Sequence, residues 1–324
     1  MEKKQKLIIG IVGGCLVIIV TLMISVLTKK DKTDEYPSKT VSIESVKTDD
    51  TELNIKNGIN VSNEKNYHYY KLSPVDTSIQ TFMSKLGIDL KKQDVQSEYL
   101  SLWSTGESYV SFDSSNNYLQ FSLEDPIAVR YDLTNNIGIE KWMKDIFEVD
   151  QKYEILESYD NGESQYIYGN ILLENIKVEF KGRDDKATIL LILDNWGYLK
   201  GGSIVLFGTI EEEYSLPSID IETLSSVIND AIYPKEVFPD VSGLYDSIDL
   251  PYISQEWRDI ENSADSCEIV DGEIVYLYSD SFQSYLLPVY KLDAFCEVYY
   301  EEESYSVPAI VYTNAVSPEY ISSE

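Results

Sequence analysis

The longest run of apolar positions lies near the beginning of the chain. Residues Leu7–Leu27 contain no charge and no proline, and lysines flank them on both sides. As a helix, this run is about 31 Å long at about 1.5 Å per residue, which matches a hydrocarbon core of about 30 Å. The pattern predicts a single transmembrane anchor, with residues 1–6 as a cytoplasmic tail.

Two alternatives to a stable anchor fit the same residues less well. The apolar region of a cleaved signal peptide is shorter and ends in small residues around a cleavage site, which Ser25-Val26-Leu27 does not provide. Val12-Gly13-Gly14-Cys15 resembles a lipidation box, but the positions after Cys15 stay apolar where a lipoprotein turns polar.

The residues that flank the anchor do not determine its orientation in the membrane. Three lysines lie on each side: Lys3, Lys4 and Lys6 before the run, and Lys29, Lys30 and Lys32 after it. The positive-inside rule therefore gives no preference, but long domains translocate largely regardless of charge. We expect a cell-membrane protein whose domain is extracytoplasmic, with the reversed orientation as the alternative.

Small residues give the anchor a candidate face for contact with another helix. Gly10 and Gly14 are four residues apart, and Thr21 and Ser25 repeat that spacing on much the same side. Small residues at this spacing let helix backbones approach closely in lipid. The pattern predicts another membrane protein as partner, although chance also produces such spacing.

The rest of the chain alternates between helical and strand-like periodicity. Residues 28–66 form a polar linker with one short strand near Thr40–Val46, and helices are predicted over 76–86, 139–147 and 221–232. The strands lie over 98–103, 109–112, 118–123, 153–159, 165–168, 171–180, 187–193, 202–212, 267–270, 273–278, 285–292, 295–300 and 305–313. Asn161-Gly162 and Asp271-Gly272 are hairpin signals, and Asn195-Trp196-Gly197 marks another turn.

This order predicts an α+β ectodomain in which helices pack on antiparallel β-meanders. A turn-prone stretch at Tyr214–Ser218 divides it into two α+β subdomains, residues 67–215 and residues 216–324.

Composition narrows the possible partners. The chain has 324 residues and a formal net charge of −30, which repels nucleic acid and anionic lipid headgroups and suits solubility, a basic partner or cations. Hydrophobic residues make up 43% of the chain, including 26 tyrosines, so the domain has enough apolar surface to fold.

The sequence offers little for catalysis. His68 is the single histidine of the chain, and a hydrolytic zinc site needs two or more His or Cys ligands. Ser62 and Lys65 match a penicillin-binding spacing but lack its companion motifs. The acidic clusters at 184–185, 211–213 and 301–303 read as solvated surface. We expect no enzyme, no metal and no cofactor.

Cysteines and tyrosines supply the remaining candidate features. With Cys15 in the anchor, Cys267 and Cys296 either form a disulfide, which fits an oxidising compartment, or stay as two buried thiols. Tyr276 and Tyr278 share one sheet face, as would Tyr305 with its neighbours, and form either a peptide- or glycan-binding face or ordinary cross-strand packing.

The carboxy-terminal segments resemble a known family. Tyr285–Leu292, followed by Tyr305–Val311, resembles the closing strands of extracytoplasmic regulators of the YycH/YycI type in Gram-positive bacteria and of related PepSY-like lipoprotein domains. The resemblance implies a single-pass anchor, an α+β ectodomain, no catalytic residues and binding to a membrane sensor kinase that controls cell-wall metabolism.

The prolines in these strands predict where a partner strand adds. Pro288 and Pro308 each lack a backbone donor and therefore belong on edges or bulges. A sheet edge at Pro288, Tyr290 and Pro308 is then a candidate site for strand addition.

Three functions remain after this reasoning. The first is a non-enzymatic, anchored interaction or regulatory domain that modulates a membrane sensor or cell-envelope complex. The second is an extracytoplasmic ligand-binding module for peptide or cell-wall glycan. The third is a carboxylate-based hydrolase, for which the sequence selects no pair of acids.

Overall fold

The computed structural model describes most of the chain beyond residue 50. The described residues are 51–56, 59, 61, 66–73, 79–181, 187–230, 233, 235–244, 260, 263–278, 285–300 and 303–316. The predicted anchor, with Gly10, Gly14, Thr21 and Ser25, lies outside them, as does the short strand predicted near residues 40–46. Within the described part, no helix is both long enough and apolar enough to span a bilayer.

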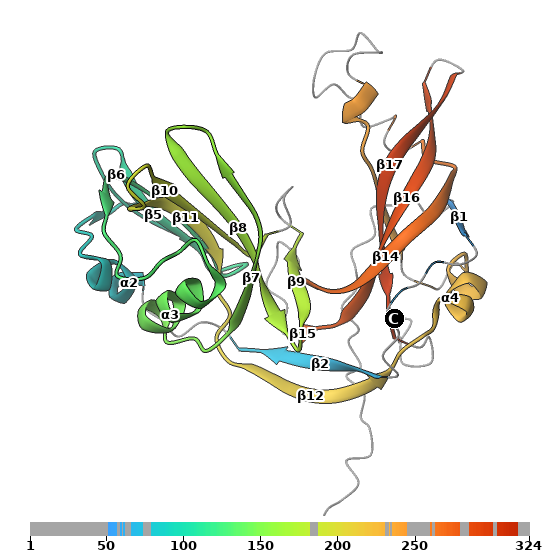
Figure 1. Ribbon diagram of the computed structural model, residues 1–324, viewed down its shortest axis with the longest axis horizontal. Coiled ribbons are helices and arrows are strands. Elements are labelled where there is room, and N and C mark those ends of the chain that lie inside the picture. Colours follow the sequence, from blue (N-terminus) through green and yellow to red (C-terminus); the bar gives the residue numbers. More distant parts are fainter. Residues whose placement is uncertain are drawn as a thin grey trace, which may run out of the picture. The chain divides into compact units, whose positions relative to one another are not determined.

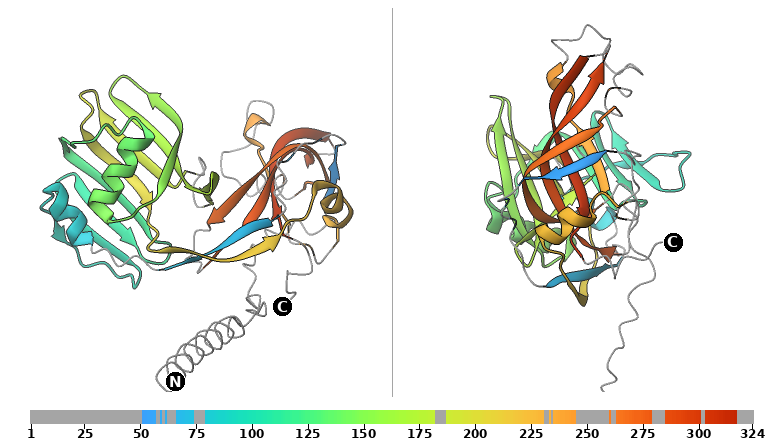
Figure 2. Two further views of the ribbon diagram at one scale, coloured as in Figure 1. Left: turned by 60° about the horizontal axis from the view of Figure 1, so that its bottom comes forward. Right: turned by 90° about the vertical axis from the view of Figure 1, so that its right-hand side faces the viewer.

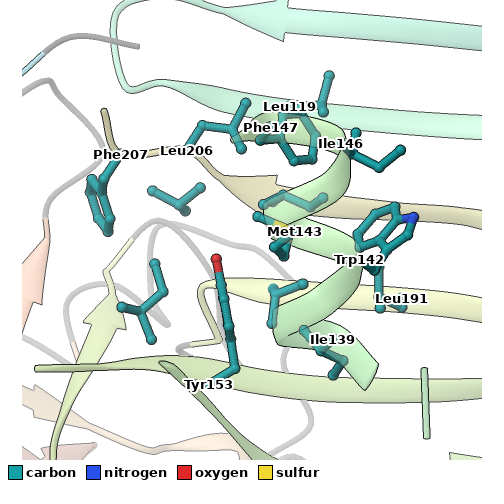
Figure 3. Close-up of a cluster of buried hydrophobic side chains, with 14 of the residues drawn as sticks. Leu119, Ile139, Trp142, Met143, Ile146, Phe147, Tyr153, Leu191, Leu206 and Phe207 are labelled. Atoms are coloured by element: carbon teal, nitrogen blue, oxygen red, sulfur yellow. The ribbon is translucent and has the colours of Figure 1, made fainter. Parts of the chain in front are cut away.

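Helix α3 (Asn136–Phe147) shows how the sequence sets local structure. The side chain of Asn135 accepts a hydrogen bond from the backbone N–H of Gly138, and Glu148 ends the helix in the left-handed region at φ 62°. The apolar side chains fall on one face and are buried: Ile139, Trp142, Met143, Ile146 and Phe147. Figure 3 shows this stripe in one cluster with Leu119 and Leu191 from the sheet.

Helix α2 (Ile79–Leu86) buries Ile79, Phe82 and Met83 on the same side of the sheet as α3 (Figures 1 and 2). Its end is set by Gly87, whose φ of +69° few other residues adopt at low cost.

Helix α4 (Ile221–Val227) begins as expected at its N-cap, Asp220, but ends earlier than the sequence predicts. Asn229 follows the helix and forms two hydrogen bonds, both of 2.9 Å, with the backbone of Leu53 in strand β1 (Glu52–Ile55). The amide therefore holds a strand where the periodicity suggested a further helical turn.

Fourteen of the described strands form one mixed sheet. Besides β1, they are β3 (Lys91–Lys92), β4 (Leu100–Thr105), β5 (Ser108–Asp113), β6 (Tyr118–Ile127), β7 (Lys152–Asp160), β8 (Ser164–Leu173), β9 (Ile176–Phe180), β10 (Ile189–Asp194), β11 (Leu199–Val205), β13 (Lys235–Pro239), β14 (Ser266–Tyr278), β16 (Pro288–Tyr300) and β17 (Glu303–Asn314). The main order is β13-β17-β16-β14-β9-β8-β10-β11-β6-β5-β4-β3, with β1 beside β14 and β7 beside β8.

A second sheet has three strands in the order β12-β2-β15. Its long strands, β12 (Ile210–Pro217) and β2 (Asn66–Leu72), run side by side (Figure 1), and β15 (Tyr285–Leu286) pairs with β2. A short 3-10 helix, η1 (Ser242–Leu244), completes the described elements.

Two main cores lie against the large sheet. One combines α2 and α3 with strands β4 to β11, and the other combines α4 with β1, β14, β16 and β17. The described chain is thus mostly β with three α-helices. Most strand pairings are antiparallel, as expected, but β14 pairs in parallel with both β1 and β9, so the large sheet is mixed.

Three predicted strand boundaries are also wrong. Asp271-Gly272 lies inside β14 at an irregularity, where a Cβ on Gly272 would lie 2.7 Å from Leu292, so this glycine allows close packing rather than a turn. The predicted strand 202–212 is split between β11 and β12 in different sheets. The turn between β8 and β9 falls at Glu174 and Asn175, both with positive φ.

The predicted linker and subdomain boundary can be placed on these elements. β1 lies inside the predicted linker, residues 28–66, yet its residues pair with β14. The predicted boundary at residue 215 falls within β12, which pairs with β2 along its length. The described residues from 51 to 316 belong to one compact unit, and the division into two subdomains stays a prediction.

The structure joins Cys267 and Cys296 in a disulfide. The two cysteines lie directly opposite each other in β14 and β16, with their Cα atoms 4.0 Å apart, and both are buried. The bond links strands that already pair, within the core under α4.

Removing this disulfide will lower the stability of the domain. The bond closes a loop with a sequence separation of 29 residues, and closing a loop of that size raises the free energy of the unfolded chain by about 3.6 kcal/mol. Urea unfolding of the Cys267→Ala/Cys296→Ala variant measures the loss. Reductant should destabilise the parent by a similar amount and leave the variant unchanged; equal stability of parent and variant contradicts the expectation.

Buried tyrosines make the domain sensitive to alkali. Burial raises the pKa of five phenols above the usual value near 10, namely Tyr153, Tyr233, Tyr278, Tyr290 and Tyr312. Below about pH 10 both folded and unfolded chains keep these protons; above it the unfolded chain releases them first, so stability falls as pH rises. Urea unfolding between about pH 8 and about pH 11 tests this, and a flat profile contradicts it.

Candidate binding surface

The structure describes only some of the residues first considered for chemistry. The Nε2 of His68 lies 3.4 Å from a carboxylate oxygen of Glu174, in the small sheet. Ser62 and Lys65 lie outside the described residues, as do residues 184–185 and 301–302. Among the described residues, no group of three His, Cys, Asp or Glu side chains is arranged to hold a metal.

The densest set of charges is a buried ion-pair network on the large sheet. Lys291 in β16 lies 2.6 Å from Glu179 in β9 and 3.4 Å from Glu273 in β14. The hydroxyl of Tyr312 in β17 donates to the other oxygen of Glu179 at 2.9 Å. Both oxygens of Glu179 thus have partners, although the residue is only 3% exposed.

A second buried pair extends the network to the outer strand. Lys181 lies 2.6 Å from Oε1 of Glu236 in β13, and its ammonium also lies 5.6 Å from the ring centroid of Phe238. The side chain of Glu236 is fully buried, and its Oε2 has no hydrogen-bond partner among the described residues. The cost of burying the Glu236 carboxylate is therefore offset by Lys181 alone.

The pKa values of this network follow its geometry. Burial by itself lowers the pKa of Lys291, but the charges and hydrogen bonds of Glu179 and Glu273 outweigh it, so the pKa is raised. Burial and the neighbouring Glu179 carboxylate both raise the pKa of Tyr312. The lysine therefore stays charged and the phenol neutral, which suits a structural connection between five strands.

The prediction of an open sheet edge at Pro288 and Tyr290 is wrong. β16 lies between β14 and β17, and Tyr290 is fully buried with its hydroxyl donating to the carbonyl of Ile219. Pro308 lies in β17, where its carbonyl accepts from Asp240 at 2.7 Å, just past the end of β13. Its missing N–H falls on that same side, so the pairing of β17 with β16 loses no bond.

Two of the three tyrosines considered for a binding face, Tyr276 and Tyr278, lie in the core. Tyr276 and Tyr278 are both fully buried, and their hydroxyls donate to the carbonyls of His68 and Asn116. Tyr305 lies in β17, with its hydroxyl 2.8 Å from a carboxylate oxygen of Glu303. The alternative interpretation, cross-strand packing, is the correct one for the two buried rings.

An aromatic and acidic surface lies instead at the ends of two neighbouring hairpins. Trp196, between β10 and β11, is 83% exposed, and Tyr198 beside it is 46% exposed. Tyr159 at the end of β7 is 56% exposed. Asp160, the last residue of β7, and Glu163 in the turn that follows are exposed as well. We call these five residues the hairpin-tip surface.

Hydrogen bonds fix the turn that carries Trp196. The carboxylate of Asp194 accepts from the backbone N–H groups of Trp196 and Tyr198, both at 2.8 Å. Gly197 takes a φ of +78°, which completes the turn. The exposed indole is thus held on an ordered backbone.

The two tips are also held to each other. The side-chain amide of Asn195 donates to the carbonyl of Gly162 at 3.1 Å, across from one hairpin to the next. In the second turn, Asn161 accepts from the N–H groups of Glu163 and Ser164. Because β8 and β10 are paired neighbours, the aromatic residues of both tips belong to one end of the sheet.

Sequence reasoning identified both turns but not the surface that they form. Asn161-Gly162 and Asn195-Trp196-Gly197 are turn signals. The large aromatic residue inside the second turn is the sequence feature that could have indicated an exposed binding surface. A tryptophan at such a position has no core to enter. Only the pairing of β8 with β10 shows that the two turns are adjacent.

Comparison with known proteins gives distant similarities of structure. No family model and no curated protein matches the chain. Ten chains of known structure match. An uncharacterized protein from Eubacterium rectale has 9% identity and a TM-score of 0.41, over 82% of this chain and 88% of that one. The Bacillus megaterium YpeB C-terminal domain has 10% identity and a TM-score of 0.25, over 73% and 99%.

Removing one lysine of the buried network will be strongly destabilising. Lys181→Met leaves the carboxylate of Glu236 buried without a counter-charge, which lowers the free energy of unfolding by about 3 kcal/mol. Adding Glu236→Gln should recover most of that loss. The control is Lys177→Met, whose pair with Glu273 is 31% and 43% exposed and contributes less than about 1 kcal/mol. Equal effects of the two lysine substitutions in urea unfolding contradict this expectation.

Proposed function

We propose that this chain is a non-enzymatic, membrane-anchored interaction domain on the extracytoplasmic side, which regulates a cell-envelope partner by binding it through the hairpin-tip surface. The observation that carries the proposal is the 83% exposure of Trp196 on a hydrogen-bonded turn. Trp196 adds little to the core, and an ordered, exposed tryptophan is the residue type that most often anchors a protein interface.

The charges around Trp196 favour a basic partner. Asp160 and Glu163 are exposed beside the aromatic side chains, and the whole chain carries a formal charge of −30. Lysine and arginine side chains stack on the faces of tryptophan and tyrosine, and carboxylates then pair with their charges. We therefore propose a Lys/Arg-rich segment of another protein as the occupant.

The disulfide supports the location of this interaction. Cys267 and Cys296 are bonded and fully enclosed, and structural disulfides persist in oxidising compartments. The apolar run at residues 7–27 supports attachment to the membrane. Together they favour a domain displayed outside the cytoplasm, where it meets the exposed parts of other envelope proteins.

The buried acids support a role without catalysis. Glu179 and Glu236 are each paired with a lysine at 2.6 Å, inside the sheet rather than at its surface. A carboxylate pair for glycoside hydrolysis needs to converge on a bound substrate. Among the described residues, the buried acids Glu179 and Glu236 connect strands of the sheet through their lysine partners.

Trp196→Ala should weaken partner binding by at least about fivefold without unfolding the domain. The tagged full-length chain is extracted gently from membranes, and co-purified proteins are quantified for the parent and the variant. Tyr99→Ala is the matched control, because Tyr99 is 56% exposed and lies near β4, away from the hairpin tips. Retention of the partner should also weaken as salt rises, since the contact is charged.

The result separates the tip from the anchor. If Trp196→Ala and Tyr99→Ala retain the same partner, the hairpin-tip surface is not the interface. If Gly10→Ile/Gly14→Ile abolishes the complex while Trp196→Ala does not, the contact lies in the membrane helix instead. Matching thermal unfolding of all variants excludes misfolding as the cause.

A further inference from the structure

A second surface feature lies at the β3 end of the main strand order, between α2 and the edge strand β3. After Gly87 the chain turns back, and the N–H of Ile88 donates to the carbonyl of Met83 at 2.8 Å. The chain then enters β3, where Lys92 pairs with Trp103 of β4. The helix and the edge strand thus form the two sides of a groove, which we call the α2–β3 groove.

The groove is an open depression with an apolar floor. Its volume is about 380 Å³, at the lower end of the range for small-molecule pockets, about 300 to 1,000 Å³. Met83 and Trp103 are only 6% and 7% exposed and line it together with Ile88. These side chains give the groove an apolar floor that is anchored in the core.

Two opposite charges line the same groove without neutralising each other. Asp89 has no ion pair or side-chain hydrogen bond in the described part of the chain, and it is exposed. Lys92 has no carboxylate partner among those residues either; its ammonium lies 5.7 Å from the ring centroid of Trp103. Both charges are therefore available to a ligand.

We propose that the α2–β3 groove binds a small zwitterion with an apolar side chain, a free amino acid or a short unblocked peptide. The ligand's ammonium pairs with Asp89, its carboxylate pairs with Lys92, and its side chain covers Met83 and Trp103. A ligand with a single charge gains one contact and meets one like charge. This inference goes beyond the proposed function, because it uses none of the hairpin-tip residues.

The test measures binding of the dipeptide Leu-Phe to the purified full-length chain in lipid nanodiscs by calorimetry. Tryptophan emission provides a second readout, since Trp103 lies in the floor of the groove. Asp89→Asn and Lys92→Gln should each weaken binding by about fivefold, as expected for loss of one exposed ion pair. N-acetyl-Leu-Phe-amide, which lacks both charges, should bind at least about tenfold more weakly.

Lys91→Gln is the matched control. Lys91 precedes Lys92 in β3, so its side chain points to the other face of the strand, and it does not line the groove. It should change affinity by less than about twofold. The proposal is overturned if the unmodified dipeptide does not bind, if the blocked dipeptide binds equally well, or if the Lys91 and Lys92 substitutions have the same effect. Trp196→Ala should leave this binding unchanged.

Discussion

The fold depends on one short parallel pairing, in which three residues of β9 lie beside three residues of β14. This contact joins the strands that carry α2 and α3 to the strands of the disulfide-bonded hairpins. Three residue pairs are few for such a connection, and the buried ion pairs reinforce it. Lys291 reaches from β16 to Glu179 of β9, and Lys181 reaches beyond β9 to Glu236 of β13. The network therefore ties the junction along several strands.

The same charges have opposite roles inside and outside the protein. In the sheet, each buried acid has a lysine partner, because a buried charge without a partner is costly. On the hairpin tips and in the α2–β3 groove, charged side chains lie beside exposed or accessible aromatic rings instead. The formal charge of −30 is thus a property of the surface. The proposed basic partner depends on that surface charge, whereas the buried pairs favour one arrangement of strands.

Short sequence motifs predicted the parts of the structure that neighbouring residues determine. The helices, apart from the end of α4, and the turns at Asn161-Gly162 and Asn195-Trp196-Gly197 followed from caps, periodicity and turn residues. The parallel pairings of β14, and strands β1, β2 and β13, did not, because they depend on segments far apart in the chain. Tyr276 and Tyr278 appeared suited to binding only as long as their burial was unknown. The hairpin-tip surface requires the same knowledge of which strands are neighbours.

The pairing of β1 with β14 also sets an order on folding. Thr51 donates to the carbonyl of Ala264 at 2.8 Å, and the two residues are 213 positions apart. During synthesis, β1 leaves the ribosome long before its partner exists, and β9 likewise has no neighbour on one side until β14 follows. Such distant contacts form slowly and leave strand edges exposed in the meantime. The domain is therefore completed only when its last hairpin arrives, and a chain shortened before residue 266 keeps open edges at both strands.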